Sequence, residues 1–455
     1  MDFDVIVVGS GQAGVPLAER LARAGKRVLI AERGELGGTC TNSGCTPTKT
    51  MIASARAAHV ARTAERLGVR VGPVEVDLGA VVDRKDGIVQ RWREGVQKRL
   101  TSAGERLTLV RGAARFVAER RIQIGAETHE AKIVILNVGA RPATPPLDGL
   151  DRVPWMTYET VMKLREVPSH LLVLGGSYVG CEFGQMFRRF GAQVTVIEMG
   201  PHLLERDDPE ISSALEAEFR DEGISLELDA KAEEISGSTG DLVLRLRGGK
   251  ELHCSHLLVA TGTRPNTDEL GCEAGGVEID EKGFVVADDE YRTSAPGTYA
   301  VGDVIDQPHF THVAWDDHRL LFDILLDRSH RGRKDRHIPY TMFTDPQVAG
   351  VGLTEREARE RGVAYEVAMM PFGQIARAIE VDETDGILKV LVDPKTERVL
   401  GAAIVGPEAG ELIHEFVVLM QAGASARAIV DAEAVHPTFA EGVQSVLMKL
   451  SRFSL

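Results

Sequence analysis

Two glycine-rich turns, each between short apolar runs, most constrain what this chain of 455 residues can fold into. The first has glycines at Gly9, Gly11 and Gly14 and leads into an expected helix, 15–24. Gly9 permits a tight turn, Gly11 lets the backbone approach a pyrophosphate, and Gly14 allows close helix–strand packing. Glu32 ends the next expected strand, 18 residues after Gly14, where an acid can bind a ribose hydroxyl. The pattern predicts a dinucleotide site with phosphates at a helix N-terminus.

The same pattern returns in the middle of the chain. Gly175 and Gly180 frame a turn in which Ser177 replaces the central glycine, and a helix is expected to end at Phe190. Glu198 again lies 18 residues after the last glycine. Serine is small enough to keep a close approach possible, although this copy is less ideal. Two such sites predict two nucleotides, for example FAD and a nicotinamide cofactor.

The remaining third of the chain, from about Pro339, shows no third copy. A strand-like run, 388–392, and an apolar helix, 411–422, indicate an α+β domain suited to interface contacts. The charged segment 331–336 is expected to be an exposed linker.

Composition narrows the class of protein. A hydrophobic content of 43% supports sizeable cores, and the length suggests about three domains. A net charge of −15 argues against nucleic-acid and anionic-membrane partners. The first residues lack a basic leader region, and no apolar stretch reaches the roughly 18 residues of a membrane helix. We therefore expect a soluble, cytoplasmic protein.

Cysteine usage indicates redox chemistry. The five cysteines are too few and too scattered for a disulfide framework, and no second pair supports a zinc site, so we predict no metal site. Only Cys40 and Cys45 lie close in sequence, which in a reducing compartment favours a catalytic pair. We expect Cys181, Cys254 and Cys272 to be buried structural residues.

The segment 37–49, Gly-Gly-Thr-Cys-Thr-Asn-Ser-Gly-Cys-Thr-Pro-Thr-Lys, resembles the redox motif of the class I pyridine nucleotide-disulfide oxidoreductases. This family includes glutathione reductase, dihydrolipoamide dehydrogenase and mercuric reductase. Further similarities lie at 260–262, 298–303, 343–346 and 436–438, so the resemblance covers essentially the whole chain.

The resemblance implies an α/β architecture with two Rossmann-like domains and a C-terminal α+β dimerisation domain. The FAD-binding domain would be split between 1–150 and 275–335. The NAD(P)-binding domain would occupy 151–274, and the dimerisation domain 336–455.

The resemblance also assigns the thiols separate roles. Cys45 would lie nearer the flavin and form the charge-transfer thiolate, while Cys40 would attack the substrate. The pair is expected to open a helix, whose N-terminus favours a thiolate. Lys49 would pair with Glu182 beside the flavin.

A histidine is expected to complete the site. His436 resembles the family's base and Glu441 its orienting acid, and thiol–disulfide exchange needs such a proton acceptor. In relatives this histidine reaches the pair of the other subunit, so the resemblance implies a homodimer with shared active sites.

The remaining expected contacts are with the cofactors. The residues expected to bind FAD are Gly9, Gly11, Gly14, Glu32, Lys49, Gly139, Asp303 and His312. The residues expected to bind NAD(P) are Gly175, Ser177, Tyr178, Gly180, Glu198 and Gly262. Within the second set, Tyr178 matches a ring that covers the nicotinamide pocket in relatives.

Nicotinamide choice and substrate stay open at this point. Glu198 would repel a 2′-phosphate, and the segment 198–202 has no arginine, so NADH is favoured over NADPH.

Residues such as Thr41, Ser43 and Thr46 resemble the mercuric-reductase-like branch. Mercury itself is disfavoured because the chain ends without a cysteine pair, starts without an extra metal-binding domain and has His436 where tyrosine is usual. A small disulfide, a hypohalous compound, a metal ion or dihydrolipoamide remain candidate substrates, and a non-catalytic flavin-binding partner protein is the alternative class.

Overall fold

The computed structural model describes residues 2–329 and 331–453, and the chain divides into two compact units. Unit 1 comprises residues 1–50, 83–143 and 262–336, and unit 2 comprises residues 51–82, 144–261 and 337–455. Two long helices, α3 (Cys45–Thr63) and α4 (Leu78–Ser102), each contribute one part to unit 1 and the other to unit 2. The three-part division expected from the sequence stays a prediction.

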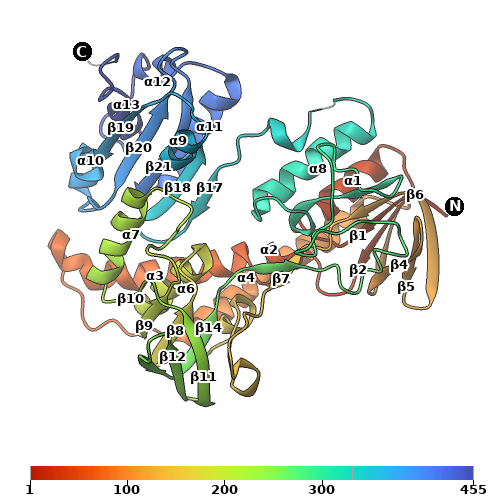
Figure 1. Cartoon of the computed structure of the whole chain (residues 1–455), viewed down its shortest axis with the longest axis horizontal. Helices are drawn as coiled ribbons and strands as arrows, with labels where there is room; N and C mark the ends of the chain where they lie inside the picture. The colour runs from red at the N-terminus through yellow and green to blue at the C-terminus, as the bar shows by residue number, and fades with distance from the viewer. Residues whose placement is uncertain (1, 330, 454–455) are drawn as a thin grey trace. The chain divides into compact units, whose positions relative to one another are not determined.

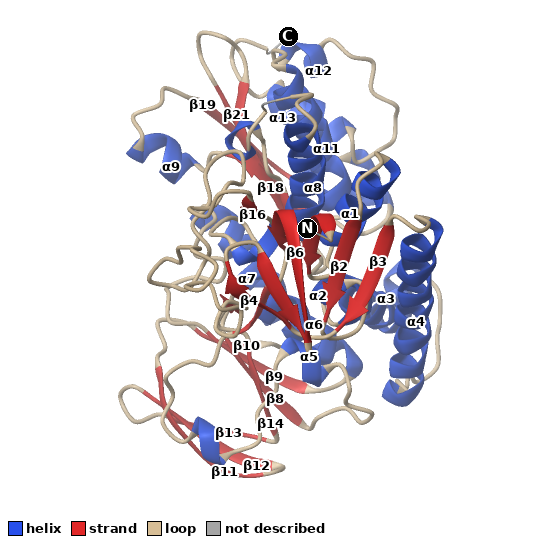
Figure 2. Cartoon of the chain, turned by 90° about the vertical axis from the view of Figure 1, so that its right-hand side faces the viewer, coloured by secondary structure: helices blue, strands red, loops and turns tan. Residues whose placement is uncertain are grey.

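Unit 1 is built on a seven-stranded sheet in the order β3-β2-β1-β6-β5-β4, with β16 paired to β6 (Figure 2). The strands of this unit are β1 (Phe3–Val8), β2 (Val28–Glu32), β3 (Leu107–Arg111), β4 (Ala114–Ala118), β5 (Arg121–Ile124), β6 (Glu127–Leu136), β7 (Ala140–Pro142), β15 (Thr263–Pro265) and β16 (Thr298–Ala300). Strands β1, β2, β3, β6 and β16 run parallel, so their carboxyl ends share one edge of the sheet. The helices of this unit are α1 (Gly14–Arg23), α2 (Gly38–Asn42) and α8 (Thr311–Leu325).

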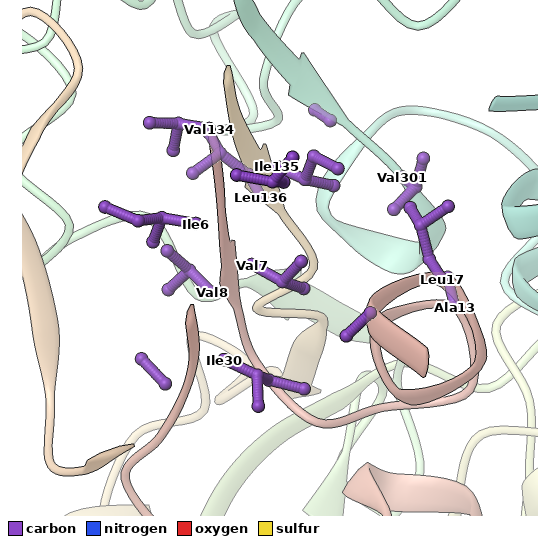
Figure 3. Close-up of a cluster of buried hydrophobic side chains, with 14 of the residues drawn as sticks. Ile6, Val7, Val8, Ala13, Leu17, Ile30, Val134, Ile135, Leu136 and Val301 are labelled. Atoms are coloured by element: carbon purple, nitrogen blue, oxygen red, sulfur yellow. The ribbon is translucent and has the colours of Figure 1, made fainter. Parts of the chain in front are cut away.

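The core of unit 1 lies where the central strands meet α1. Val7 points toward Leu17 of α1, while Ile6 and Val8 point to the opposite face (Figure 3). All of these side chains are buried, as a parallel sheet covered on both faces requires. Helix α1 begins one residue before the expected 15–24 and ends one residue earlier, at Arg23.

The expected exposed linker, 331–336, is wrong at two residues, Gly332, which is buried, and Arg336. The Arg336 side chain is only 5% exposed, and its Nη1 donates to the buried Asp317 at 2.8 Å. A buried carboxylate without a cation is costly, so this arginine is drawn into the unit.

Unit 2 contains the second nucleotide-type sheet. Its four parallel strands follow the order β10-β9-β8-β14, beside a three-stranded antiparallel sheet, β11-β12-β13 (Figure 1). The elements are β8 (His170–Leu174), β9 (Gln193–Ile197), β10 (Ser225–Glu227), β11 (Ala232–Ser238), β12 (Asp241–Leu246), β13 (Glu251–Cys254), β14 (His256–Val259), α5 (Tyr158–Val161), α6 (Tyr178–Phe190) and α7 (Pro209–Asp221). Helix α6 ends at Phe190, as expected.

The C-terminal part of unit 2 is a five-stranded antiparallel sheet in the order β17-β18-β21-β20-β19. Its elements are β17 (Tyr340–Met342), β18 (Gln347–Gly352), β19 (Glu366–Pro371), β20 (Ile387–Val392), β21 (Val399–Gly406), α9 (Glu355–Glu360), α10 (Ala376–Glu380), α11 (Ala409–Ala422), α12 (Arg427–Val430) and α13 (Glu441–Leu447). Buried side chains from α11 and α13 join its core. The expected α+β character is confirmed, and α11 starts two residues before the expected 411–422.

Candidate active site

The first glycine-rich turn joins β1 to α1 and leaves no room for side chains. Gly9 has a φ of +102°, and a Cβ there would lie 2.3 Å from the carbonyl oxygen of Asn137. A Cβ on Gly14 would lie 2.2 Å from the Gly9 oxygen, and one on Gly11 would lie 3.1 Å from Nδ2 of Asn137. Nδ2 of Asn137 also donates to the Gly9 oxygen at 3.2 Å. The turn is therefore closed against the loop that follows β6.

The acid expected at a ribose hydroxyl lies beside this turn. Glu32 ends β2, and its carboxylate accepts the backbone N–H of Ser10 at 2.9 Å, the Ser10 hydroxyl at 2.6 Å and the Gly34 N–H at 2.7 Å. A carboxylate has about four acceptor positions, so one is left for a further hydroxyl.

The other residues expected to bind FAD gather at the same sheet edge. Gly139 follows β6, and Asp303 follows β16 in a short 3₁₀ turn, Gly302–Val304. Burial raises the pKa of Asp303, and the preceding Gly302 N–H donates to Asp317 at 2.8 Å. In open parallel sheets, ligands bind outside the carboxyl ends of the strands. These loops, with the closed glycine turn, fit an FAD.

The two cysteines lie together in unit 1. Cys40 is in the short helix α2, and Cys45 is the first residue of α3, as expected. Both are partly exposed thiols outside any disulfide, and they are in hydrogen-bonding contact with each other. A thiol at a helix N-terminus faces unpaired N–H groups and the positive end of the helix dipole.

The electrostatics of the pair distinguish the two thiols. The pKa of Cys40 is raised well above its usual range. The causes, from the largest, are its hydrogen bond to Cys45, its burial and the negative charge at Cys45. A negative charge on one sulfur thus opposes ionisation of the other, as expected for two groups sharing a site. Cys40 needs a base to become a nucleophile.

Thr311 is a site residue that the sequence analysis did not single out. Its Oγ1 lies 2.9 Å from the Cys45 sulfur, and its hydrogen bond lowers the pKa of Cys40. It is the first residue of α8, next to the expected FAD contact His312, whose ring stacks on Phe310 at 5.3 Å. The signal that the sequence offered was the neighbouring residue, His312, which the resemblance places at the FAD.

Lys49 and Glu182 lie in different units, so their expected pairing stays a prediction. Lys49 lies one turn beyond Cys45 in α3. Glu182 is buried on α6, where its carboxylate accepts the Phe343 N–H at 2.8 Å.

The second glycine-rich turn joins β8 to α6 in unit 2. Gly175 has a φ of +113°, and a Cβ there would lie 2.5 Å from the Ala260 oxygen. A Cβ on Gly180 would lie only 1.8 Å from the Gly175 oxygen. Ser177 is exposed and its hydroxyl makes no capping bond to α6. Gly262, the last residue expected at this cofactor, has a φ of +117° and belongs to unit 1.

Two side chains next to the second turn carry its expected specificity. Glu198 follows β9 and accepts the N–H groups of Gly176 at 2.7 Å and Gly200 at 3.0 Å, much as Glu32 does at the first turn. Tyr178 is the first residue of α6, and its ring stacks on Tyr340 with centroids 5.5 Å apart.

The expected base and its acid meet in the C-terminal part. Nδ1 of His436 lies 3.0 Å from Oε1 of Glu441, whose other oxygen accepts the Thr438 N–H at 2.8 Å. These bonds lower the pKa of Glu441, the Thr438 bond most of all. The His436 side chain is 69% exposed, so Nε2 has room for a group from outside the chain.

The other three cysteines are buried, as expected. Burial raises the pKa of Cys181 and Cys272 and raises that of Cys254 to about 11. Such thiols are poor nucleophiles.

Within residues 2–329 and 331–453, no group of three or more histidine, cysteine or carboxylate side chains could hold a metal ion. In the same residues, no helix combines the length and apolar character needed to span a bilayer.

Comparison with known proteins shows the family of the chain. Residues 3–317 match the model of the pyridine nucleotide-disulphide oxidoreductases, and residues 338–447 match their dimerisation domain. A dihydrolipoyl dehydrogenase of Thermus scotoductus is 35% identical, with 99% of this chain and 98% of the relative covered. A mercuric reductase of Staphylococcus aureus is 32% identical over 97% of this chain and 81% of its own length.

A solved structure is also similar over the full length. The Cu(II) complex of the HOCl-induced flavoprotein disulfide reductase RclA from Escherichia coli has a TM-score of 0.91 and 30% identity. The match covers 99% of this chain and 100% of that one.

Proposed function

Because the chain belongs to the pyridine nucleotide-disulphide oxidoreductase family, we propose that Cys40 and Cys45 pass electrons from NADH to a small disulfide. The family uses FAD and a pyridine nucleotide, so the predicted oxidoreductase class and cofactor types are confirmed. When bound, FAD accepts a hydride from the nicotinamide and supplies two electrons to a cysteine disulfide. The contact between Cys40 and Cys45, with Thr311 on Cys45, is the observation that carries the proposal.

The contacts support separate roles for the thiols. Cys45 lies at the N-terminus of α3 with a hydroxyl at 2.9 Å, a setting that stabilises a thiolate. The raised pKa of Cys40 means that its thiol must lose a proton to a base before it can react. The attack on the substrate is the step in which a base takes part. We assign Cys45 to the flavin side and Cys40 to the substrate.

The exchange reaction then balances as follows. Cys40 loses its proton to a base and its sulfur attacks the substrate disulfide, forming a mixed disulfide and releasing one substrate thiolate. Cys45 attacks the Cys40 sulfur, forming the Cys40–Cys45 disulfide and releasing the second thiolate. The base returns its proton, and the substrate has gained two electrons and, with one proton from solvent, two protons.

We assign the base to His436 of the partner subunit. Its exposed ring in the single chain, the fixed contact with Glu441 and the dimerisation-domain match support a homodimer with shared sites. In this assignment, the FAD-binding domain is 1–150 with 275–335, the NAD(P)-binding domain is 151–274, and the dimerisation domain is 336–455.

Subunit complementation tests the shared site. Cys40→Ser and His436→Ala homodimers should both lose disulfide reduction. A purified heterodimer of the two variants retains one complete site if the base acts across the interface, so it should recover about half of the wild-type rate. A heterodimer as inactive as its parents would contradict the assignment.

Glu198 supports NADH as the donor. Two backbone N–H groups fix its carboxylate at the end of β9, where it would accept a ribose hydroxyl and repel a 2′-phosphate. Steady-state kcat/KM should favour NADH over NADPH by about tenfold or more, and Glu198→Gln should reduce that ratio, since the repulsion is lost. The matched change Glu32→Gln should leave the ratio unchanged. A wild-type preference for NADPH would contradict the proposal.

A second candidate substrate is a small oxidant such as Cu(II). The similarity to the copper complex of RclA over the whole chain favours it. Two Cu(II) ions would oxidise the dithiol to the disulfide and leave as Cu(I). Turnover with Cu(II), hypohalous compounds, Hg(II), dihydrolipoamide and small disulfides should be compared, and any true substrate should lose turnover in Cys40→Ser. Full activity of that variant would show that Cys40 is not the attacking thiol.

A further inference from the structure

The second glycine-rich turn is followed directly by a stacked aromatic pair. The rings of Tyr178 and Tyr340 stack with an interplanar angle of 19° and centroids 5.5 Å apart. Tyr178 opens α6 directly after the turn, whereas Tyr340 comes from β17, the first strand of the C-terminal sheet. Such a pair is stabilised beyond the apolar area that it buries.

The hydroxyl end of the Tyr340 ring is held by two close neighbours. Its hydroxyl donates to Oδ1 of Asp207, a carboxyl group that is 5% exposed. Behind the ring, Gly350 of the neighbouring strand leaves the needed space, because a Cβ there would lie 2.6 Å from the ring carbon Cε1. Strand β18 pairs Gly350 directly with Tyr340.

The segment that carries Asp207 is itself tied to the turn. The Leu204 N–H donates to the Gly176 oxygen at 3.1 Å, and the Asp207 N–H donates to the Leu204 oxygen at 2.8 Å. From α9, Arg356 donates to the carbonyl oxygens of Glu205 and Arg206 at 3.0 and 3.1 Å. Asp207 is therefore a fixed acceptor rather than a mobile surface group.

We propose that Tyr340, anchored by Asp207, is a positioning residue that holds the Tyr178 ring in its stacked place and so sets the free-energy cost of nicotinamide entry. This rests on the proposed function and on the family resemblance, which implies that the Tyr178 ring covers the nicotinamide site; in our proposal the ring moves aside when NADH binds. Binding must then break the stack, so the stack weakens nucleotide affinity. Tyr340 touches neither cofactor nor substrate in this account and acts only through Tyr178.

A double-mutant cycle tests the proposal on the holoenzyme. Oxidised wild type, Tyr340→Leu, Tyr178→Ala and the double variant are mixed rapidly with NADH without oxygen, and flavin reduction is followed at increasing NADH. The concentration dependence gives a Kd, and the plateau gives the limiting rate. Tyr340→Leu should lower the Kd for NADH about threefold to tenfold, because this factor corresponds to the free energy of one aromatic stack. In the Tyr178→Ala background, the same change should shift the Kd by less than about twofold.

Two further variants separate positioning from general damage. Tyr340→Phe and Asp207→Ala remove the anchoring bond but keep the ring, so each should shift the Kd in the same direction by a smaller factor. Asp207→Asn keeps an acceptor oxygen for the Tyr340 hydroxyl and should stay near wild type. If Tyr340→Leu does not fold, the Kd values of these variants still show whether the anchored Tyr340 ring affects NADH binding.

The outcomes are distinct. An unchanged or raised Kd in Tyr340→Leu, or an equal shift in both backgrounds, would overturn the positioning role while leaving the proposed function intact. If neither NADH nor NADPH reduces the wild-type flavin, the proposed function fails, and this inference fails with it.

Discussion

The turn at Gly9 and the turn at Gly175 both follow a parallel strand, and in both an added Cβ would meet a backbone oxygen. They differ in the groups that lie beside them. Asn137 bonds to the first turn, and Gly38 packs so tightly on it that a Cβ there would lie 2.7 Å from the Gly11 Cα. The second has the exposed Ser177 at the matching place and a partly buried aromatic ring beside it.

In the proposed function, this difference distinguishes the turn for a resident cofactor from the turn for an exchanged one. Contacts from the loop after β6 and from the segment before the cysteines enclose the first turn. The second turn also packs on a backbone oxygen, that of Ala260, but beside it lies a stack of two side chains, Tyr178 and Tyr340, which can separate without breaking backbone hydrogen bonds. We infer that the first turn retains FAD and that the second admits and releases the nicotinamide cofactor.

The largest expected effects come from Gly14→Ala and Gly180→Ala. Each Cβ would clash with a backbone oxygen, so each variant should lose about 1–3 kcal/mol of unfolding free energy or more. Their functional losses should differ: Gly14→Ala should purify with little FAD, whereas Gly180→Ala should keep FAD but resist reduction by NADH. Flavin absorbance and anaerobic reduction measure both.

Gly87→Ala is the matched control, since a Cβ there meets nothing within 4 Å. It should keep both FAD and NADH reduction. Equal loss of FAD in Gly14→Ala and Gly180→Ala would remove the distinction between the turns.

A smaller effect is expected from Asn137→Ala. It removes the bond from Nδ2 to the Gly9 oxygen at 3.2 Å, which is worth about 0.5–1.5 kcal/mol. FAD should therefore bind several-fold more weakly to the refolded apoprotein, with the KM for NADH unchanged. A change in KM alone would show that Asn137 does not serve the first turn.

The smallest effect is expected from Ser177→Gly, which makes the second turn more like the first. The Ser177 hydroxyl makes no capping bond, so the stability change should be a few tenths of a kcal/mol. The KM for NADH should change by less than about twofold, because steric room is already present. A tenfold change would show that the serine hydroxyl binds the nucleotide.

The sequence predicted well those features whose chemistry is local. These features are the two turns, the acid that follows each of them and the cysteine pair. Each lies within a short segment, in which residue type and spacing determine the geometry. Thr311 was missed because its contact with Cys45 spans 266 positions. Tyr340 and Asp207 were missed for the same reason, since a tyrosine next to a proline carries no sign of its distant partner. Arg336 was wrongly expected in solvent because its buried partner, Asp317, lies on helix α8, 19 positions earlier.

The most direct test of the central claim is the long-wavelength charge-transfer absorbance of the Cys45 thiolate beside the oxidised flavin. The separate roles of the thiols predict that Cys40→Ser shows this band as purified, without reductant, because Cys45 is left as a free thiolate. Cys45→Ser should lack the band at every stage of anaerobic NADH titration. A band in Cys45→Ser and none in Cys40→Ser would reverse the assignment and contradict the account.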